Sequence, residues 1–298
     1  MDRSRARLEG CITVAIRLAG YSVILFVIVI FLFLLSDGLP ALTEVKPDEL
    51  ASSLWYPIEN YYGLLPLILG SLLVTIAATA IAVPIGVGTA IYIAEVAPRS
   101  AREILKPLVE VMAGVPSVVL GFVGIRVLAP NLRLVLDLPT GLTALAGALL
   151  LAAISLPTIV SVAEDALDAV PRSYRDAALA LGATSWETIW RVTLPAARTG
   201  VLTAVMLGIG RAIGETMTVM MVTGNAPVVP TGLGNLFMPI RTMTATIAAE
   251  MGEVATDSVH YHVLFFIGIV LFLISLAVNL TASAVVFRQR KRYERVMS

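Results

Sequence analysis

The chain has 298 residues, of which 58% are hydrophobic and only 14% are charged, and its formal net charge at pH 7 is zero. Soluble domains average about 45–50% apolar and 25% charged residues, so this composition excludes an ordinary soluble protein and indicates an integral membrane protein. The single cysteine, Cys11, excludes an internal disulfide and a cysteine-based metal site.

Six apolar runs are long enough to cross a bilayer as helices, because about 20 such residues span its hydrocarbon core. They lie at about 15–35, 65–94, 108–129, 141–163, 200–224 and 262–287. No run alternates between apolar and polar positions as the strands of a membrane barrel do. The sequence therefore predicts an all-α, polytopic membrane protein with six transmembrane helices.

The basic residues indicate how these spans are oriented. Most of the 21 lysines and arginines precede the first span, follow the sixth, or lie between spans two and three or four and five. Short loops rich in lysine and arginine stay in the cytoplasm, so both termini are expected there. The first span is interpreted as an uncleaved signal anchor, since no clear small-x-small cleavage site follows it.

The connection between spans four and five, residues 164–200, is too regular for a simple loop. Apolar residues recur near helical spacing on both sides of Gly182, which predicts two short amphipathic helices around a glycine turn. Ser185 and Glu187 offer cap chemistry for the second helix without a strict capping box, and Pro195 is expected to end it. The helix pair either rests on the lipid surface or docks a cytoplasmic partner, and docking is the favoured interpretation.

This connection resembles the cytoplasmic signature of ABC-importer permeases, in which E-A-A, three residues, glycine and nine residues precede I-x-L-P. The matching residues here are Asp176, Ala177, Ala178, Gly182, Val192, Leu194 and Pro195. Asp176 and Val192 depart from the signature but keep its charge or shape. In that family the segment sits in a cleft of the ATPase subunit, so the resemblance implies that residues 171–195 are an ATPase-coupling segment.

Further stretches narrow the resemblance to the PstC-type permeases of phosphate-specific ABC importers. They are YGLLPLILGSLLVT, AVPIGVGTAIYIAEVAP, LKPLVEVMAGVPSVVLGF, GRAIGETMTVMMVTGN, and MTATIAAEMGEV with HYHVLFFIGIVLF. The resemblance implies a type I importer transmembrane domain in a bacterial inner membrane, carrying inorganic phosphate by alternating access. It also implies a second, related permease subunit, two cytoplasmic ATPase subunits that bind ATP and magnesium, and a periplasmic or lipid-anchored phosphate-binding protein.

Three regions are expected along the chain. Residues 1–62 form a tail, the first span and an outer loop, residues 63–290 form the permease core, and residues 291–298 form a second tail. No G-x-x-x-x-G-K-[ST] motif occurs, so we expect no cofactor in this chain and no catalytic activity of its own. No metal site is expected either, and His260 and His262 are interpreted as anchors at the membrane interface.

Two charged residues, Arg211 and Glu215, stand inside the fifth predicted span. A charge at membrane depth costs a few kcal/mol or more, so such residues mark functional sites by default. Residues four apart share a helix face, and Gly210 with Gly214 form a G-x-x-x-G that lets another helix approach closely. Because a guanidinium stays charged and can form two parallel hydrogen bonds to an oxyanion, we favour a substrate path over a salt bridge that only fixes helix register.

The other polar residues predicted along this path are Ser117, Thr216 and Asn225. Near Ser117, the prolines and glycines of 114–124 favour close helix packing over a broken helix that aims backbone N–H groups at an anion. Alternatives remain open for the function. Sulfate or molybdate would suit Arg211 as well as phosphate, a proton-coupled secondary transporter could use Glu215 as its relay, and a membrane sensor or scaffold would need no transport path.

Overall fold

The computed structural model describes the backbone of residues 3–297 and the side chains between residues 12 and 284, except residue 282. Within these residues, six helical stretches are long and apolar enough to cross a membrane. They are Ile12–Glu44, Leu65–Val96, Ser117–Val135, Ala144–Asp168, Ser185–Gly214 and Val259–Thr281. The predicted all-α fold with six spans is therefore confirmed.

The first element is a long helix, after which a small cap of residues 41–62 leads into the rest of the bundle. In chain order they are α1 (Arg3–Gly38), α2 (Ala41–Glu44), α3 (Pro47–Leu50), β1 (Trp55–Tyr56), η1 (Pro57–Glu59), β2 (Tyr61–Tyr62), α4 (Leu65–Ile91), η2 (Tyr92–Val96), α5 (Arg99–Ala113), α6 (Ser117–Val123), η3 (Gly124–Leu128), α7 (Ala129–Val135), α8 (Ala144–Asp168), α9 (Arg172–Ala180), α10 (Ser185–Thr188), η4 (Ile189–Thr193), α11 (Leu194–Gly214), α12 (Met217–Val222), η5 (Leu233–Phe237), α13 (Met243–Glu250) and α14 (Val259–Met297). The two strands pair antiparallel, with Trp55 opposite Tyr62.

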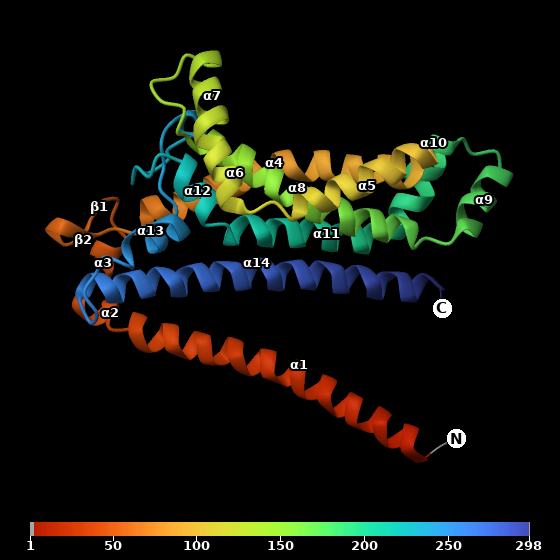
Figure 1. The fold of residues 1–298 in the computed structure, drawn as a ribbon, viewed down its shortest axis with the longest axis horizontal. Helices are drawn as coiled ribbons and strands as arrows, with labels where there is room; N and C mark the ends of the chain where they lie inside the picture. The colour runs from red at the N-terminus through yellow and green to blue at the C-terminus, as the bar shows by residue number, and fades with distance from the viewer. Residues whose placement is uncertain (1–2, 298) are drawn as a thin grey trace.

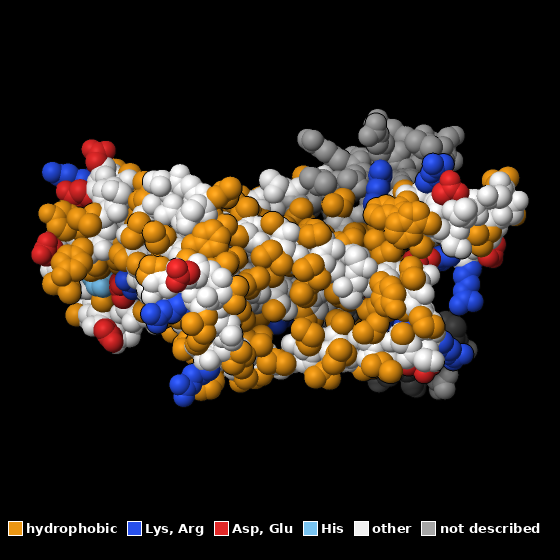
Figure 2. Space-filling view, turned by 90° about the horizontal axis from the view of Figure 1, so that it is seen from above, with side chains coloured by type: hydrophobic (Ala, Val, Ile, Leu, Met, Phe, Trp, Pro, Cys, Tyr) orange, Lys and Arg blue, Asp and Glu red, His pale blue; other side chains and the backbone are white. Residues whose placement is uncertain are grey.

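The long helices run roughly along one axis (Figure 1). The hairpin of β1 and β2 lies with α2 and α3 at one end, while α9, α10 and the described ends of α1 and α14 lie toward the other. Figure 2 shows one face of the molecule largely covered by hydrophobic side chains, with most of the visible charged side chains near its two ends. This distribution suits a bundle whose middle lies in lipid.

The helix α8 is the most buried of the six spans and packs between α4 and α11. Small residues permit this packing, because a Cβ added at Gly86 or Gly208 would lie only 2.8 or 2.4 Å from side-chain atoms of Ile159. A Cβ at Gly200 would lie 2.3 Å from that of Ala166. Membrane helices associate through such close backbone approach rather than through the hydrophobic effect.

Three π-turns, η2, η3 and η4, each end two positions before a proline, so that one residue lies between the turn and the proline. In each, the residue preceding the proline donates its backbone N–H to the carbonyl five residues earlier, as Leu194 does to Ile189 before Pro195. A proline has no N–H to donate and its ring crowds the preceding turn, and the wider π-turn relieves both problems. The prediction that Pro195 ends its helix is wrong, because the helical run continues through it into α11.

Two predicted spans are displaced. The third begins at Ser117 rather than near 108, because α5 is a separate amphipathic helix and the chain turns at 114–116, with Pro116 in an extended conformation. The fifth is Ser185–Gly214 rather than 200–224, and the rest of the predicted span forms the separate short helix α12.

One of the expected regional boundaries falls inside a helix. The backbone of α14 continues past residue 290 to Met297, so the predicted tail at 291–298 begins inside a helix. Residues 1, 2 and 298 and the side chain of Cys11 lie outside the described part of the chain.

Candidate functional site

The helix that carries Arg211 ends beside α12, on the side of the bundle nearer the β1–β2 hairpin (Figure 1). The last residue of α11 is Gly214, and Glu215 adopts an extended conformation with ψ of 128° before α12 begins at Met217. Residues 211 and 215 therefore do not share one helix face. The prediction that Arg211 and Glu215 lie on one face of a continuous helix is wrong.

Glu215 is committed to the start of α12. Its carboxylate accepts a hydrogen bond from the backbone N–H of Thr218 at 3.2 Å, and its carbonyl accepts one from the Thr244 hydroxyl at 3.2 Å. A carboxylate at this position satisfies an orphan N–H of the first helical turn and complements the positive end of the helix.

Arg211 is exposed on the last turn of α11, and no carboxylate of the described residues lies within 4.0 Å of its guanidinium. Its location near a helix C-terminus is favourable for a cation but worth only about 0.3–1 kcal/mol. That is less than the few kcal/mol that a charge costs at membrane depth. The exposed guanidinium is therefore accessible to a ligand or to a second subunit.

Ser117 lies close to this break. It is the first residue of α6, and its carbonyl accepts a hydrogen bond from the Thr218 hydroxyl at 2.9 Å. The helices α6 and α12 pack closely, since a Cβ at Gly121 would lie 2.6 Å from the sulfur of Met221. The broken helix and the close packing that the sequence posed as alternatives are thus both present, the break at 114–116 and the packing beyond it.

The other predicted path residues lie at different points of α12. The Thr216 hydroxyl donates to the Gly214 carbonyl at 3.3 Å, beside the helix break. Asn225 lies beyond the opposite end of α12 in a left-handed conformation, with φ of 49°, and its side-chain amide donates to the Met220 carbonyl at 2.7 Å. The structure therefore brings Ser117, Glu215 and Thr216 together and separates Asn225 from them.

Within the described part of the chain, no other segment packs against Gly210 and Gly214, because a Cβ added to either would have no neighbouring atom within 4 Å. The close approach that the sequence assigned to them is made instead by Gly208. A packing role for Gly210 and Gly214 remains a prediction for a second subunit.

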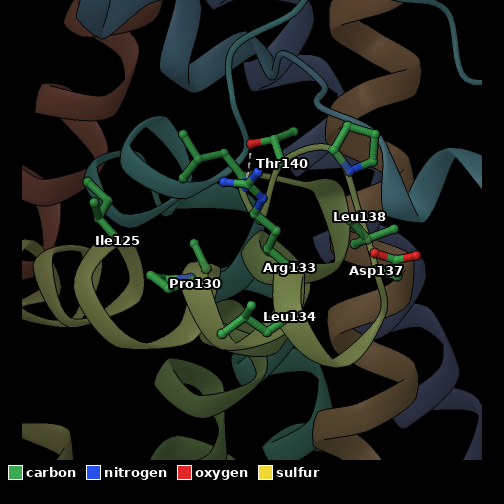
Figure 3. Close-up of a pocket in the computed structure, with 11 residues that line it drawn as sticks. Ile125, Pro130, Arg133, Leu134, Asp137, Leu138 and Thr140 are labelled. Carbon is green, nitrogen blue, oxygen red and sulfur yellow. Dashed lines mark hydrogen bonds between the residues drawn. The ribbon is translucent and has the colours of Figure 1, made fainter.

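A hollow of the surface lies elsewhere, between α7 and the loop that follows it (Figure 3). It measures about 710 Å³ and contains none of the predicted site residues. Figure 3 shows Arg133 directed toward Thr140 and Asp137 directed away from both. The end of α7 beside this hollow is apolar and exposed, since Leu134 is 79% exposed.

The coupling segment 171–195 forms the predicted helix, turn and helix. Gly182 has φ of +86°, a left-handed conformation that side chains other than glycine rarely adopt, so it ends α9. The cap of α10 differs from the prediction, since Thr184 rather than Ser185 is the N-cap and forms a full capping box with Glu187. Of the signature residues, Asp176, Ala177 and Gly182 are exposed, Ala178 is buried, and Leu194 and Pro195 are half-buried.

This segment also presents large apolar side chains at the end of the bundle. Leu181 is 90% exposed, Trp186 60% and Trp190 47%, and the two tryptophan rings pack edge to face with centroids 5.6 Å apart. Aromatic and apolar side chains clustered on an exposed turn are typical of a protein-binding surface.

Comparison with known proteins decides the family. Residues 82–293 match the family described as "Binding-protein-dependent transport system inner membrane component". The chain belongs to this family. Among its relatives is the "Probable ABC transporter permease protein YqgH" of Bacillus subtilis, 40% identical over 83% of this chain and 81% of the relative.

Other relatives are named for a substrate. The "Phosphate transport system permease protein PstC" of Mesorhizobium japonicum is 34% identical over 94% of this chain and 87% of its own length. PstC 1 of Mycobacterium tuberculosis is 37% identical over 78% of this chain and 75% of its own length. The match thus extends over most of the length of these permeases.

Solved structures agree on the fold. The inward-facing methionine ABC transporter MetNI superposes with a TM-score of 0.60 at 18% identity, covering 79% of this chain and all but 1% of the matched one. A bacterial alginate ABC transporter gives 0.58 at 15% identity, with 91% and 94% covered. The fold is therefore that of a type I ABC importer transmembrane domain.

Sequence reasoning missed ion pairs between distant segments, including one with a buried carboxylate. Lys106 on α5 lies 2.7 Å from Glu164 of α8, whose side chain is only 3% exposed, and 3.4 Å from Asp165. The hydrogen bond to Glu164 and the nearby carboxylate charges raise the pKa of Lys106 despite partial burial. Periodicity could not reveal these pairs, because the partners are far apart in the chain.

Mutation of the exposed leucine on the coupling segment should disrupt partner binding. We expect Leu181→Asp to reduce co-purification of the cognate ATPase subunit at least tenfold, because a buried interface anchor is worth about 2 kcal/mol or more. The measurement is the amount of ATPase recovered with affinity-tagged permease. Leu134→Asp, an equally drastic change at an exposed leucine beside the outer hollow, should leave recovery unchanged; equal recovery with both variants contradicts the docking role.

The cap formed by residues 41–62 is held by a half-buried carboxylate, Glu250. Its oxygens lie 2.5 Å from Nη2 of Arg241, 2.8 Å from Nε2 of His260 and 3.3 Å from Nε1 of Trp55. Trp55 is buried rather than interfacial, and the described residues contain no cluster of three metal-binding side chains. His260 therefore has Glu250 as its partner within the chain. The partner of His262 is Glu44, whose carboxylate oxygen lies 2.8 Å from Nδ1 of the ring.

This cap should loosen in acid. Burial alone would raise the pKa of Glu250, but the hydrogen bond from His260, the charge of Arg241 and the bond from Trp55 together lower it below its ordinary value of 4.5. A lowered folded pKa stabilises the cap above pH 4.5, and this stabilisation is lost as the pH falls through the lower value. Tryptophan fluorescence should report opening below about pH 4.5 that Glu250→Gln makes independent of pH; the exposed Glu253→Gln is the control, and a wild-type-like acid transition in Glu250→Gln contradicts the assignment.

Proposed function

We propose that this chain is the permease subunit of an ATP-driven importer and forms the translocation path for inorganic phosphate by alternating access. The family places it among transport permeases, and several relatives at 31–37% identity are named as phosphate permeases. The chain itself supplies no ATPase motif, so the energy comes from a partner subunit.

One observation carries the proposal: Arg211 is exposed on the last turn of the fifth span, and no carboxylate of the described residues lies within 4.0 Å of its guanidinium. Because Glu215 is engaged at α12, it leaves the guanidinium available to a ligand. A permanently charged, forked donor suits a phosphate oxyanion, which itself needs a compensating cation inside the membrane. In the assembled importer a second permease subunit encloses this position and packs against the bare glycines Gly210 and Gly214.

The remaining partners follow from the two ends of the bundle. Two cytoplasmic ATPase subunits, which bind ATP and magnesium, dock on the exposed turn of the coupling segment. That end of the bundle therefore lies in the cytoplasm with both termini, in accord with the basic residues flanking the spans. A phosphate-binding protein delivers substrate to the opposite, periplasmic end.

A proton-coupled mechanism through Glu215 fits less well. A relay carboxylate must exchange its proton with a water-filled path, whereas the Glu215 carboxylate satisfies a backbone N–H of α12. The resemblance to ABC permeases also extends over most of the chain.

Uptake into proteoliposomes tests the proposal. The permease is reconstituted with its second permease, ATPase and binding protein, and labelled phosphate uptake is followed with and without ATP, protonophore, sulfate and molybdate. We expect uptake that requires ATP, survives the protonophore and is not inhibited by the other anions. Uptake that persists without ATP and collapses with the protonophore contradicts the proposal, and inhibition by sulfate or molybdate overturns the phosphate assignment.

A further inference from the structure

Arg175 has the most extensively bonded side chain in the coupling segment. Its Nε donates to both carboxylate oxygens of Glu95 at 3.1 Å, and its Nη2 donates to Oε1 of Glu95 at 2.5 Å. Its guanidinium also donates to the carbonyls of Leu167 at 2.9 Å and Val170 at 2.7 Å. One side chain therefore joins α9 to the π-turn η2 that follows α4 and to the end of α8.

Both charges are largely removed from water. The Arg175 side chain is 19% exposed and the Glu95 side chain 8%. The carbonyls that Arg175 reaches lie at the C-terminal end of α8, where intrahelical donors are lacking and a cation is favoured. A guanidinium suits a carboxylate and two carbonyls at once, because it carries five donors in a fixed plane.

Apolar packing does little to hold α9 against the bundle. Ala178 is its one buried residue. A hollow of about 400 Å³, lined by Tyr174 of α9, Val170 and residues of α8 and α11, lies at its base. The coupling segment is also joined to the bundle through the chain at both ends, to α8 through residues 169–171 and to α11 through α10 and η4. What Arg175 adds is a connection to Glu95 in η2, at the end of α4, through polar contacts that keep a fixed geometry.

We propose that Arg175 and Glu95 form a positioning pair that transmits movement of the coupling segment to α4. When the ATPase subunits move the segment, α8 and α11 follow through the chain, and α4 follows through this pair. The pair thereby keeps α4 in step with the two helices on which the segment is built. The inference rests on the proposed function only in requiring a partner ATPase, whatever anion is carried.

The rival account is that the pair merely fixes the local fold, as many buried salt bridges do. The two accounts differ in what happens to ATP hydrolysis. A purely structural pair affects assembly, so uptake and ATPase activity fall together. A transmitting pair affects the amount of substrate moved per ATP, while the ATPase remains bound and active.

The test measures anion transported per ATP hydrolysed in proteoliposomes holding the complete importer. We expect Arg175→Gln and Glu95→Gln each to lower this ratio at least fivefold with normal ATPase co-purification, and the double variant to be no worse than either. Arg175→Lys, which keeps the charge but loses the planar fork, should lower the ratio less. The control is Arg99→Gln, which breaks an exposed arginine–glutamate pair on α5, outside the coupling segment, and should leave the ratio unchanged.

An unchanged ratio in both glutamine variants overturns the inference. It is equally overturned if uptake and co-purified ATPase fall in parallel. Should Arg175→Gln fail to assemble, Arg175→Lys decides, because a wild-type ratio in that variant excludes a need for the fork geometry. Failure of the wild-type complex to couple any anion uptake to ATP contradicts the proposed function instead, so the two failures are distinguishable.

Discussion

Replacing Arg211 with glutamine should lower ATP-driven phosphate uptake at least tenfold while membrane insertion stays normal. Glutamine is similar in length and can donate hydrogen bonds, but it loses the charge and the fork. A hydrogen bond to a charged group is worth about 1.5–3 kcal/mol, which corresponds to roughly a tenfold to hundredfold loss. The measurement is the initial rate of labelled phosphate uptake in proteoliposomes, normalised to reconstituted permease.

Two controls make this result specific. Arg211→Lys retains the charge without the bidentate geometry and should fall between wild type and Arg211→Gln. Arg126→Gln changes another exposed arginine within a span, one whose guanidinium lies 5.9 Å from the centre of the Phe122 ring, and should transport normally. Wild-type uptake by well-inserted Arg211→Gln permease would remove Arg211 from the path.

The second large effect is on stability. Lys106→Met should destabilise the permease by about 3 kcal/mol, because Glu164 would then be buried without its cation. The Glu164 atom Oε1 already lacks a hydrogen-bond partner among the described residues, so little else can compensate. The drop in thermal unfolding temperature in detergent measures this effect.

The matched controls come from the same two helices. The double variant Lys106→Met/Glu164→Met removes both charges and should recover most of the lost stability, since replacing a buried pair by apolar residues is often neutral. Arg99→Met breaks an exposed pair with Glu103 on α5 and should change stability by less than about 0.5 kcal/mol. If Lys106→Met and Arg99→Met behave alike, the buried pair does not stabilise the bundle.

Much of the fold could be predicted because its determinants are local. Apolar length alone located the first, second, fourth and sixth spans, and the glycine at 182 marked the turn of the coupling segment. The prolines misled in both directions. Pro195 is absorbed by a preceding π-turn, while Pro116 and its neighbours end α5 and displace the third span.

The site was harder to predict because one broken helix changed its geometry. Apolar residues continue on both sides of Glu215, so hydropathy could not distinguish a continuous span from α11 followed by α12. At the break, the Glu215 carboxylate accepts a hydrogen bond from the backbone N–H of Thr218. Every residue except proline has such an N–H, so the residue types could not indicate this contact. The pairs Arg175 with Glu95 and Lys106 with Glu164 depend on tertiary contacts between distant segments. The residue type of Arg211 was informative, but its partner could not be read from spacing.

An experimental structure of the complete importer with phosphate bound tests the central claim most directly. The account predicts the Arg211 guanidinium on the route between the two permease subunits, within hydrogen-bond distance of a phosphate oxygen, with Glu215 still at the start of α12. A guanidinium that faces lipid, or that is closed off by a carboxylate of the second subunit while phosphate binds elsewhere, would contradict it.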